Sequence, residues 1–190
     1  MDPRPGERIL DMCAAPGSKT THMAEKMDNL GEITSRDVSD KKLNKIRENA
    51  ARLGISIIHP EIGDGMVLDP LSEAAYDRVL LDAPCSGLGI IRRKPEIRYR
   101  RSPEDIAVLA SMQKKMLENA SRYVKRGGVL VYSTCSVDPE ENDGVVRAFL
   151  AAQPSFKLVH TPWSDEDGFT RLYPSVQKTD GFFIVKLVRV

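Results

Sequence analysis

Two of the three cysteines in this chain of 190 residues lie in short polar loops. Cys85 follows the run Asp82-Ala83-Pro84, and Cys135 follows Ser133-Thr134, each just beyond a predicted β-strand. A thiol in a polar loop can be held as a thiolate by nearby donors and can then act as a nucleophile, whereas a thiol in an apolar run is usually buried and inert. The loops therefore predict covalent chemistry, with Cys135 as the candidate nucleophile.

The spacing of the cysteines argues against a metal site and against disulfides. Cys13, Cys85 and Cys135 are odd in number, lie 72 and 50 residues apart, and include no C-x-x-C pair. Neither a disulfide framework nor a zinc site has this pattern, and the three histidines are equally scattered. We therefore expect no metal. Cys13, between Met12 and Ala14, has the surroundings of a small buried side chain.

Four aspartates each close a predicted strand: Asp11, Asp37, Asp64 and Asp82. In open α/β sheets, ligands bind beyond the carboxyl ends of the strands. An acid about twenty residues after the first loop suits the two hydroxyls of a nucleotide ribose, and Asp37 stands in that place. Any one of these acids could equally be a helix cap or a solvated turn residue. Four in successive strands favour a ligand site.

The loop after the first strand indicates which cofactor fits. Residues 13–19 read Cys-Ala-Ala-Pro-Gly-Ser-Lys, which is not the G-x-G-x-x-G pattern of dinucleotide-binding proteins. A phosphate-binding P-loop would need glycines where the chain has Cys13 and Ser18. A dinucleotide oxidoreductase is therefore a remote alternative. A cofactor with an adenosine but no pyrophosphate fits better, and S-adenosylmethionine is the common one.

A short basic segment follows the Cys85 loop. Residues 92–101 contain six cations and one acid, Glu96. A local run of charge is usually a solvated surface, but this run adjoins the candidate site and includes Tyr99 as a stacking surface. We therefore favour contact with an RNA backbone. The six cations are Arg92, Arg93, Lys94, Arg98, Arg100 and Arg101.

The elements that must position these residues alternate between strand and helix. This alternation predicts right-handed βαβ units, and hence an α/β fold whose mainly parallel sheet is covered on both faces. An antiparallel pair of strands at the C-terminal edge completes the prediction. The expected strands are 8–11, 32–37, 55–62, 77–82, 129–133, 156–160 and 182–190, and the expected helices end near Met27, Leu53, Val124 and Ala152. The last of these helices is predicted to begin at Asp138, with Glu141 completing its cap.

Composition limits the class of protein. Lys and Arg number 28 and Asp and Glu number 27, for a net charge of +1, so the chain is not a uniformly basic nucleic-acid coat. With 41% hydrophobic residues and no long apolar run, it suits one globular domain over residues 1–190. No stretch resembles a signal peptide or a membrane span. We expect a cytoplasmic monomer without membrane contact.

Three motifs resemble those of a known family. The segments Asp11 to Thr20, Asp82 to Gly87 and Ser133 to Ser136, in this order, resemble the RNA (cytosine-5)-methyltransferases. Within them, the chain is most similar to the bacterial 16S ribosomal RNA methyltransferases of the Sun type. The resemblance runs from about Asp2 to Val190, and it includes Pro139-Glu140-Glu141-Asn142 and Asp180-Gly181-Phe182-Phe183.

The resemblance implies a Rossmann-like S-adenosylmethionine-dependent fold and a role for each motif. Asp37 would bind the ribose, Asp64 the adenine edge, and Asp82 would lie between cofactor and target base. Cys135 would be the nucleophile that attacks cytosine in RNA, and Cys85 would assist release of the product. The loop around the methionine part of the cofactor would consist of Cys13, Ala14, Ala15, Pro16, Gly17, Ser18 and Lys19.

The resemblance also shows two departures and leaves two alternatives. Ser18 stands where the family usually has a second glycine, and the family's separate N-terminal RNA-binding domain is absent from this chain, which therefore resembles a catalytic fragment. A DNA cytosine methyltransferase would use the cysteine of the Pro-Cys motif as nucleophile, and the Thr134-Cys135 motif argues against it. A non-catalytic module that binds S-adenosylmethionine or RNA is the other alternative.

Overall fold

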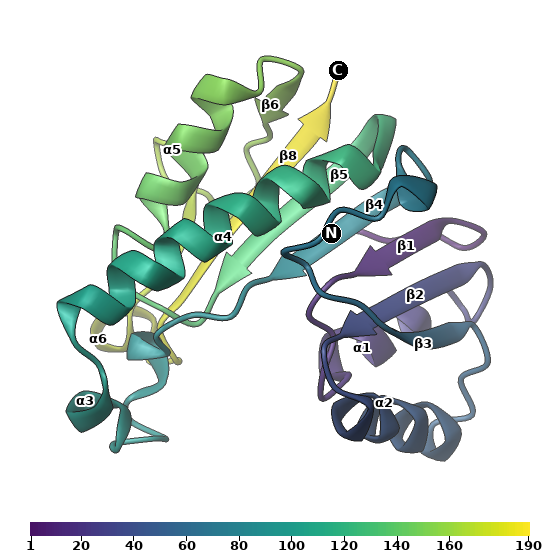
Figure 1. The fold of residues 1–190 in the computed structure, drawn as a ribbon, viewed down its shortest axis with the longest axis horizontal. Helices are drawn as coiled ribbons and strands as arrows, with labels where there is room; N and C mark the ends of the chain where they lie inside the picture. The colour runs from purple at the N-terminus through teal and green to yellow at the C-terminus, as the bar shows by residue number, and fades with distance from the viewer.

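A mixed sheet of eight strands forms the centre of the computed structural model, which describes residues 1–190 (Figure 1). The strand order is β3-β2-β1-β4-β5-β8-β6, with β7 also paired to β8. The first five strands are parallel, and β8 is antiparallel to β5, β6 and β7. The strands are β1 (Arg8–Asp11), β2 (Glu32–Asp37), β3 (Ile58–Ile62), β4 (Tyr76–Asp82), β5 (Val124–Thr134), β6 (Phe156–Leu158), β7 (Thr170–Leu172) and β8 (Phe182–Arg189).

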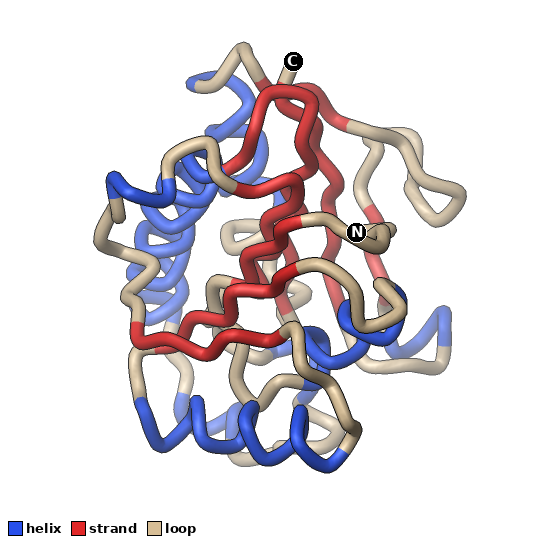
Figure 2. Tube along the Cα trace, turned by 90° about the vertical axis from the view of Figure 1, so that its right-hand side faces the viewer, coloured by secondary structure: helices blue, strands red, loops and turns tan.

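Helices cover both faces of this sheet, and Figure 2 shows the strands as one layer between them. Alternate residues of a strand point to opposite faces, so Leu10 and Leu81 join a core cluster of 22 residues while Ile9 and Leu80 join a second cluster of 13. The larger cluster is completed by α4 (Pro103–Tyr123) and α5 (Asp143–Ala152), and the smaller by α1 (Ser18–Lys26) and α2 (Asp40–Arg52). The prediction of a mainly parallel, doubly covered sheet is confirmed.

The topology determines where a ligand can bind. The chain winds outward from β1 to β2 and β3, then returns to add β4 and β5 on the other side of β1. The reversal between β1 and β4 opens a crevice at the carboxyl ends of the strands. Three of the predicted acids, Asp11, Asp37 and Asp82, are the last residues of β1, β2 and β4. The fold therefore brings these strand ends to one edge.

Helix α4 and strand β5 meet earlier than the sequence pattern predicts. The helix begins at Pro103, and the Ser102 side chain caps it by accepting a hydrogen bond from the Asp105 backbone. Val124 was expected in the helix, but it is the first residue of β5. Gly127 and Gly128 also lie inside β5, where its pairing with β4 is irregular. Buried Val124 satisfies either pattern, so periodicity alone could not separate them.

The start of α5 is also different from the prediction. The helix begins at Asp143, not at Asp138. The Asp138 carboxylate accepts a hydrogen bond from the Glu140 backbone and closes a turn, which leaves Glu141 outside the helix and fully buried. Sequence reasoning also missed β7, and β3 begins at Ile58 rather than Ile55. Short strands such as β7 carry too few residues for a periodic signal.

Two backbone segments close on each other beside the Cys85 loop. Gly89 belongs to a short 3-10 helix, η2 (Leu88–Ile90), and Gly181 precedes β8. The Gly89 N–H donates to the Cys135 carbonyl at 2.9 Å, and the Gly181 N–H donates to the Gly89 carbonyl at 2.8 Å. A Cβ atom on Gly89 would lie 2.2 Å from the Gly181 oxygen, so no larger residue fits.

No helix of the chain is long and apolar enough to cross a membrane.

Candidate active site

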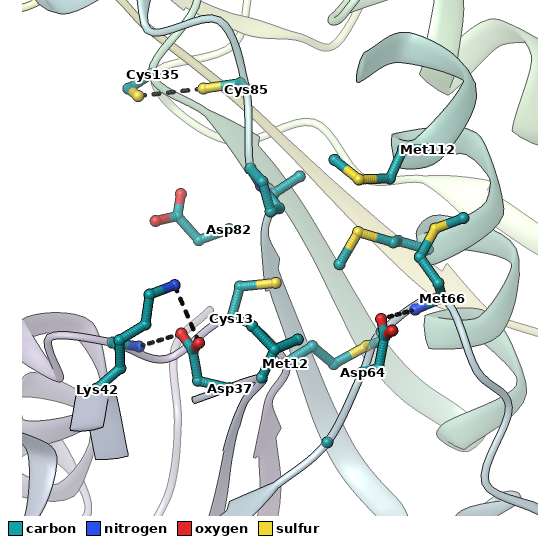
Figure 3. Close-up of a pocket in the computed structure, with 17 residues that line it drawn as sticks. Met12, Cys13, Asp37, Lys42, Asp64, Met66, Asp82, Cys85, Met112 and Cys135 are labelled. Carbon is teal, nitrogen blue, oxygen red and sulfur yellow. Dashed lines mark hydrogen bonds and ion pairs between the residues drawn. The ribbon is translucent and has the colours of Figure 1, made fainter. Parts of the chain in front are cut away.

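A cavity of about 410 Å³ opens at the carboxyl ends of β1, β2, β3, β4 and β5 (Figure 3). We call it the acidic cavity, because three aspartates line it: Asp37, Asp64 and Asp82. Met12 and two methionines of α4 supply much of its apolar surface. Seven of the residues predicted from the sequence line this one cavity: Cys13, Ala15, Asp37, Asp64, Asp82, Cys85 and Cys135.

The rest of the predicted cofactor loop lies around the cavity rather than along its wall. Ala14 and Gly17 are buried, while Pro16 and Ser18 are exposed. Gly17 precedes α1 with φ 102°, a backbone conformation that favours glycine. Ser18 is the first residue of that helix. The side chain of the fifth residue, Lys19, extends to Asp82.

The three acids of the cavity have different partners. Asp37 is 6% exposed, and its carboxylate accepts hydrogen bonds from Lys42 Nζ at 3.1 Å and from the Ala15 N–H at 3.4 Å. Asp64 Oδ1 accepts from the Met66 N–H at 2.9 Å, which folds the loop after β3 into a tight turn. Each carboxylate has an oxygen with remaining acceptor capacity, as a ribose or an adenine amino group would need.

Asp82 is held by two donors that orient it within the site. Its Oδ2 atom accepts from Lys19 Nζ at 2.6 Å, and its Oδ1 atom accepts from the Ser133 hydroxyl at 2.7 Å. Lys19 Nζ also lies 5.3 Å from the centre of the Phe182 ring. Ser133 pairs with Asp82 because β4 and β5 are in register there. Both acceptor oxygens therefore have fixed directions. In the view of Figure 3, Asp82 lies between the thiol pair and Asp37.

Cys85 and Cys135 contact each other directly. Their Sγ atoms are 3.2 Å apart, although 50 residues separate them in sequence (Figure 3). The hydrogen bond from Cys85 lowers the pKa of Cys135, and the same interaction together with burial raises the pKa of Cys85. The pair is therefore asymmetric: Cys135 is the easier thiol to ionise, and as a thiolate it would accept a hydrogen bond from the Cys85 thiol.

The third cysteine behaves differently. Cys13 also lines the acidic cavity, but burial raises its pKa, and the carboxylates of Asp11, Asp37 and Asp82 raise it further. A thiol with this environment stays protonated and is a poor nucleophile. The geometry thus favours the role that the sequence suggested for Cys13, a small apolar side chain in the wall.

A buried carboxylate whose contacts the sequence did not indicate supports the Cys85 loop. Glu141 is fully buried, and its Oε1 atom accepts from the Ser86 N–H at 2.8 Å and from Gln113 Nε2 at 2.9 Å. Its Oε2 atom accepts from the Ser86 hydroxyl. The predicted role of Glu141 as part of a helix cap is wrong, because its side chain turns inward to these donors. Only the three-dimensional fold reveals this, since β4, α4 and the segment before α5 are distant in sequence.

The same network reaches the Cys135 loop. The hydroxyls of Ser86 and Ser136 are 3.0 Å apart, which joins the residues that follow the two cysteines. Asn142 accepts from the Thr134 hydroxyl at 2.5 Å and donates to the Ser136 carbonyl at 3.0 Å. We refer to Glu141 and Asn142 as the brace. The brace ties both thiol-bearing loops to the start of α5.

The basic segment is more balanced than the sequence suggested. Glu96 was expected to be its only opposing acid, but the fold also brings Asp180 to it. Arg93 Nε lies 2.8 Å from Asp180, and an Arg92 nitrogen lies 3.6 Å from it. This pairing follows from the close approach of Gly89 and Gly181.

No group of three or more His, Cys, Asp or Glu side chains is arranged to hold a metal ion.

Comparison with solved structures identifies the class of fold. An S-adenosylmethionine-dependent O-methyltransferase from Thermotoga maritima superposes on 100% of this chain and 61% of that chain with a TM-score of 0.61, at 12% identity. NSun6 from Pyrococcus horikoshii matches 99% of this chain and 49% of that chain with a TM-score of 0.89, at 37% identity. The chain therefore has the Rossmann-like fold of S-adenosylmethionine-dependent methyltransferases, which confirms the predicted fold class.

Sequence comparison then gives the family. The family model described as 16S rRNA methyltransferase RsmB/F matches residues 1–188. The probable ribosomal RNA small subunit methyltransferase B of Bacillus subtilis (strain 168) is 42% identical over 197 residues, covering 98% of this chain. The chain belongs to the RsmB/F family of 16S rRNA methyltransferases, and the resemblance to the Sun type is confirmed. It spans 44% of the length of the Bacillus relative.

Proposed function

We propose that residues 1–190 are a catalytic domain that transfers a methyl group from S-adenosylmethionine to carbon 5 of a cytosine in RNA, with 16S ribosomal RNA as the substrate. One observation carries the proposal: two thiols in contact at 3.2 Å form part of the wall of a cavity lined by Asp37, Asp64 and Asp82. Family membership supports the substrate class. A ribosomal RNA substrate implies action in the cytoplasm.

The acidic cavity fits the cofactor by size and by chemistry. Its volume of about 410 Å³ is within the usual range of small-molecule sites. Asp37 would hold the ribose and Asp64 the adenine edge, while Met12 and the α4 methionines offer apolar surface. The loop from Cys13 to Lys19 would enclose the methionine part. The structure of NSun6 contains SFG, an analogue of S-adenosylmethionine, which supports this assignment.

Cys135 would activate the target base. Carbon 5 of cytosine is a weak nucleophile, and addition of the Cys135 thiolate to carbon 6 moves an electron pair onto the ring. A new S–C6 bond forms and the C5–C6 double bond is converted to an enamine, which can attack an electrophilic methyl group. S-adenosylmethionine supplies that methyl group on a sulfonium. The lowered pKa of Cys135 increases the fraction of thiolate available for this step.

Asp82 and Cys85 would complete the reaction. Asp82, which Lys19 and Ser133 orient, would hold the edge of the base as charge develops on the ring. After methyl transfer, a base must remove the proton from carbon 5 so that the S–C6 bond can break and the aromatic ring can return. Cys85 is our candidate for this release step, because it contacts Cys135 and lines the same cavity. To act as the base it must first lose its own proton, and formation of the S–C6 bond makes this easier because it removes the Cys135 thiolate that raises the pKa of Cys85.

The test uses labelled methyl transfer and the two cysteine variants. Wild-type protein is incubated with 16S ribosomal RNA and S-adenosylmethionine labelled in the methyl group, and the modified base is mapped. We expect Cys135→Ser to abolish transfer. Cys85→Ser should instead accumulate a covalent RNA adduct, visible as a slow band on a denaturing gel.

The opposite result would overturn the assignment. If Cys135→Ser retained methyl transfer and Cys85→Ser lost it, Cys85 would be the nucleophile, as the cysteine of the Pro-Cys motif is in DNA cytosine methyltransferases. Absence of S-adenosylmethionine binding at millimolar concentration, measured by calorimetry, would contradict the cofactor assignment. Binding of the cofactor without any transfer would favour a non-catalytic module.

A further inference from the structure

A second cavity, of about 530 Å³, also has the thiol pair in its wall. It lies between the Cys85 loop and the segment that contains α3 (Ile97–Arg100). Cys85 and Cys135 line both cavities, and no other residue does. The thiol pair is therefore the shared wall between the acidic cavity and this second space, which we call the basic cavity.

Three of the six cations in the basic segment line the basic cavity: Lys94, Arg100 and Arg101. None of them has a carboxylate within 4.0 Å, although Glu96 also lines the space. Arg101 Nε donates to the Ser86 carbonyl at 3.3 Å, so one edge of its guanidinium is fixed next to the Cys85 loop. Its other N–H groups have no partner in the protein. With three cations and one carboxylate in its lining, the cavity has a net positive charge beside the candidate nucleophile.

The remaining three cations have a different environment. Arg92 and Arg93 pair with Asp180, at 3.6 Å and 2.8 Å, and Asp180 is largely buried. Arg98 lies on α3 but does not line the cavity. The fold therefore divides one run of sequence into two sets of equal charge. Lys94, Arg100 and Arg101 face the cavity, and Arg92, Arg93 and Arg98 do not.

The lining of the basic cavity indicates the kind of ligand. Ile90 and Ile97 give it apolar surface next to the cations and the thiols. A nucleotide has matching parts, since its base is flat and largely apolar on its faces and its phosphates are anionic. A base inside a helix is stacked and paired, so it reaches such a space only when it is unstacked.

We propose that the basic cavity receives the target nucleotide from a single-stranded stretch of RNA, and that Lys94, Arg100 and Arg101 bind the phosphodiester groups on either side of it. Arg92 and Arg93 instead hold the segment to Asp180. This inference rests on the proposed function, which requires a cytosine to reach Cys135, and it assigns the cations that bring it there. The acidic cavity would approach the same base from the other side of the thiol pair.

The test compares two triple variants of the full chain that remove the same charge. One is Lys94→Gln/Arg100→Gln/Arg101→Gln, and the other is Arg92→Gln/Arg93→Gln/Arg98→Gln. Affinity for a labelled single-stranded RNA with one cytosine is measured by fluorescence anisotropy across a salt series. Each lost phosphate contact lowers the slope of log affinity against log salt by about 0.7. We expect the first variant to bind at least tenfold more weakly with a slope lower by about 2. The second should keep the wild-type slope, because it leaves the three proposed phosphate contacts in place.

Folding is checked separately, because the second triple variant removes the Asp180 ion pairs. Thermal unfolding and calorimetry with S-adenosylmethionine are recorded for both. The single variants Arg100→Gln and Arg98→Gln, two residues apart on α3, repeat the comparison with the smallest change. We expect Arg100→Gln to lower the affinity for RNA clearly and Arg98→Gln to leave it unchanged.

The outcomes separate this inference from the proposed function. The assignment of the basic cavity would be overturned if the two triple variants lost RNA affinity and salt slope equally, or if the wild type did not bind RNA. This holds even if methyl transfer is observed. RNA binding that depends on Lys94, Arg100 and Arg101, without transfer and without a Cys85→Ser adduct, would uphold the cavity as a nucleotide site and overturn the proposed function.

Discussion

Asp11 and Asp82 end neighbouring strands, but their surroundings differ. Asp82 is partly exposed and is held by Lys19 and Ser133. Asp11 is 1% exposed and accepts one hydrogen bond from the Thr20 hydroxyl at 2.7 Å. Burial raises the pKa of Asp11 to about 7, an effect that the Thr20 hydrogen bond opposes and the nearby Asp82 carboxylate reinforces. Asp11 is therefore a buried acid that takes up a proton near neutral pH.

The raised pKa of Asp11 predicts how stability depends on pH. A carboxyl group whose pKa is higher in the folded state adds most to the free energy of unfolding at pH values below its unfolded pKa, near 4. This stabilisation is lost as the pH rises through the folded-state pKa of about 7. Asp11→Asn stays neutral throughout. We expect the variant to exceed the wild type in stability at pH 8, by at most about 4 kcal/mol, and to approach it at pH 4. Urea unfolding at both pH values measures this, and an identical pH dependence in the two proteins would contradict it.

At the scale of single residues, sequence reasoning found the reactive groups but not their partners. Cys85, Cys135 and Asp82 could be predicted because the carboxyl ends of parallel strands share one edge. The pairing of Ser133 with Asp82 depends on the register of β4 and β5, which no local pattern specifies. The contact of Arg93 with Asp180 likewise depends on how the chain returns after α5.

Among the elements, the brace before α5 links the largest number of functional parts. Glu141 contacts the Cys85 loop through Ser86 and contacts α4 through Gln113. Asn142 contacts the Cys135 loop. A carboxylate buried without a cation is costly unless all its acceptor sites are used, and here three donors converge on it. We therefore expect the brace to set the relative position of the two thiols.

Replacing the carboxylate by an amide tests this role. Glu141→Gln replaces one carboxylate oxygen by an N–H₂ group. With the remaining oxygen toward the Ser86 N–H and Gln113, the N–H₂ group faces the Ser86 hydroxyl, which must turn from donor to acceptor, and the charge-assisted bonds are lost, so we expect a loss of about 1–3 kcal/mol in stability. We also expect slower formation of the RNA adduct when the change is made in a Cys85→Ser background. The neighbouring Glu140→Gln is the control, because Glu140 is exposed. An adduct rate that Glu141→Gln leaves unchanged would contradict the positioning role.

The predictability of the elements follows their length. The strands of the parallel sheet and the long helices carry enough periodic residues to be identified within a few positions. The boundary at Val124 was missed because a buried valine suits both a helix and a strand. The turn at Asp138 was read as a helix cap because the same side chain can close either structure. The brief α3 and β7 have no periodic signal at all.

On the scale of the whole molecule, the acidic cavity joins the two sides of the sheet. Met12 and Met116 in its wall belong to the larger core cluster, while Ala15 packs against the smaller one. A ligand there contacts parts of both clusters. It would therefore stabilise the domain as a unit rather than one loop.

Ligand binding should thus be visible as a change in global stability. At a concentration one hundred times its Kd, S-adenosylmethionine would stabilise the protein by about 2.7 kcal/mol, which raises Tm by several degrees. We expect Asp37→Asn to remove most of this rise, because Asp37 is the proposed ribose ligand. Asp40→Asn, a change at an exposed site on α2, should keep it. Thermal unfolding with and without the cofactor measures this rise in Tm for each variant. An equal rise in the two variants would contradict the role of Asp37.

The contact between Cys85 and Cys135 has a further consequence for the environment in which the protein can work. Sulfur atoms 3.2 Å apart need to approach by only roughly 1 Å to form a disulfide, with two electrons and two protons passing to an oxidant such as diamide. We expect diamide to reduce the number of thiols that react with maleimide under denaturing conditions from three to one, and dithiothreitol to restore them. Retention of all three thiols would contradict this. Oxidation would consume the proposed nucleophile and its proton donor together, so methyl transfer would depend on a reducing environment.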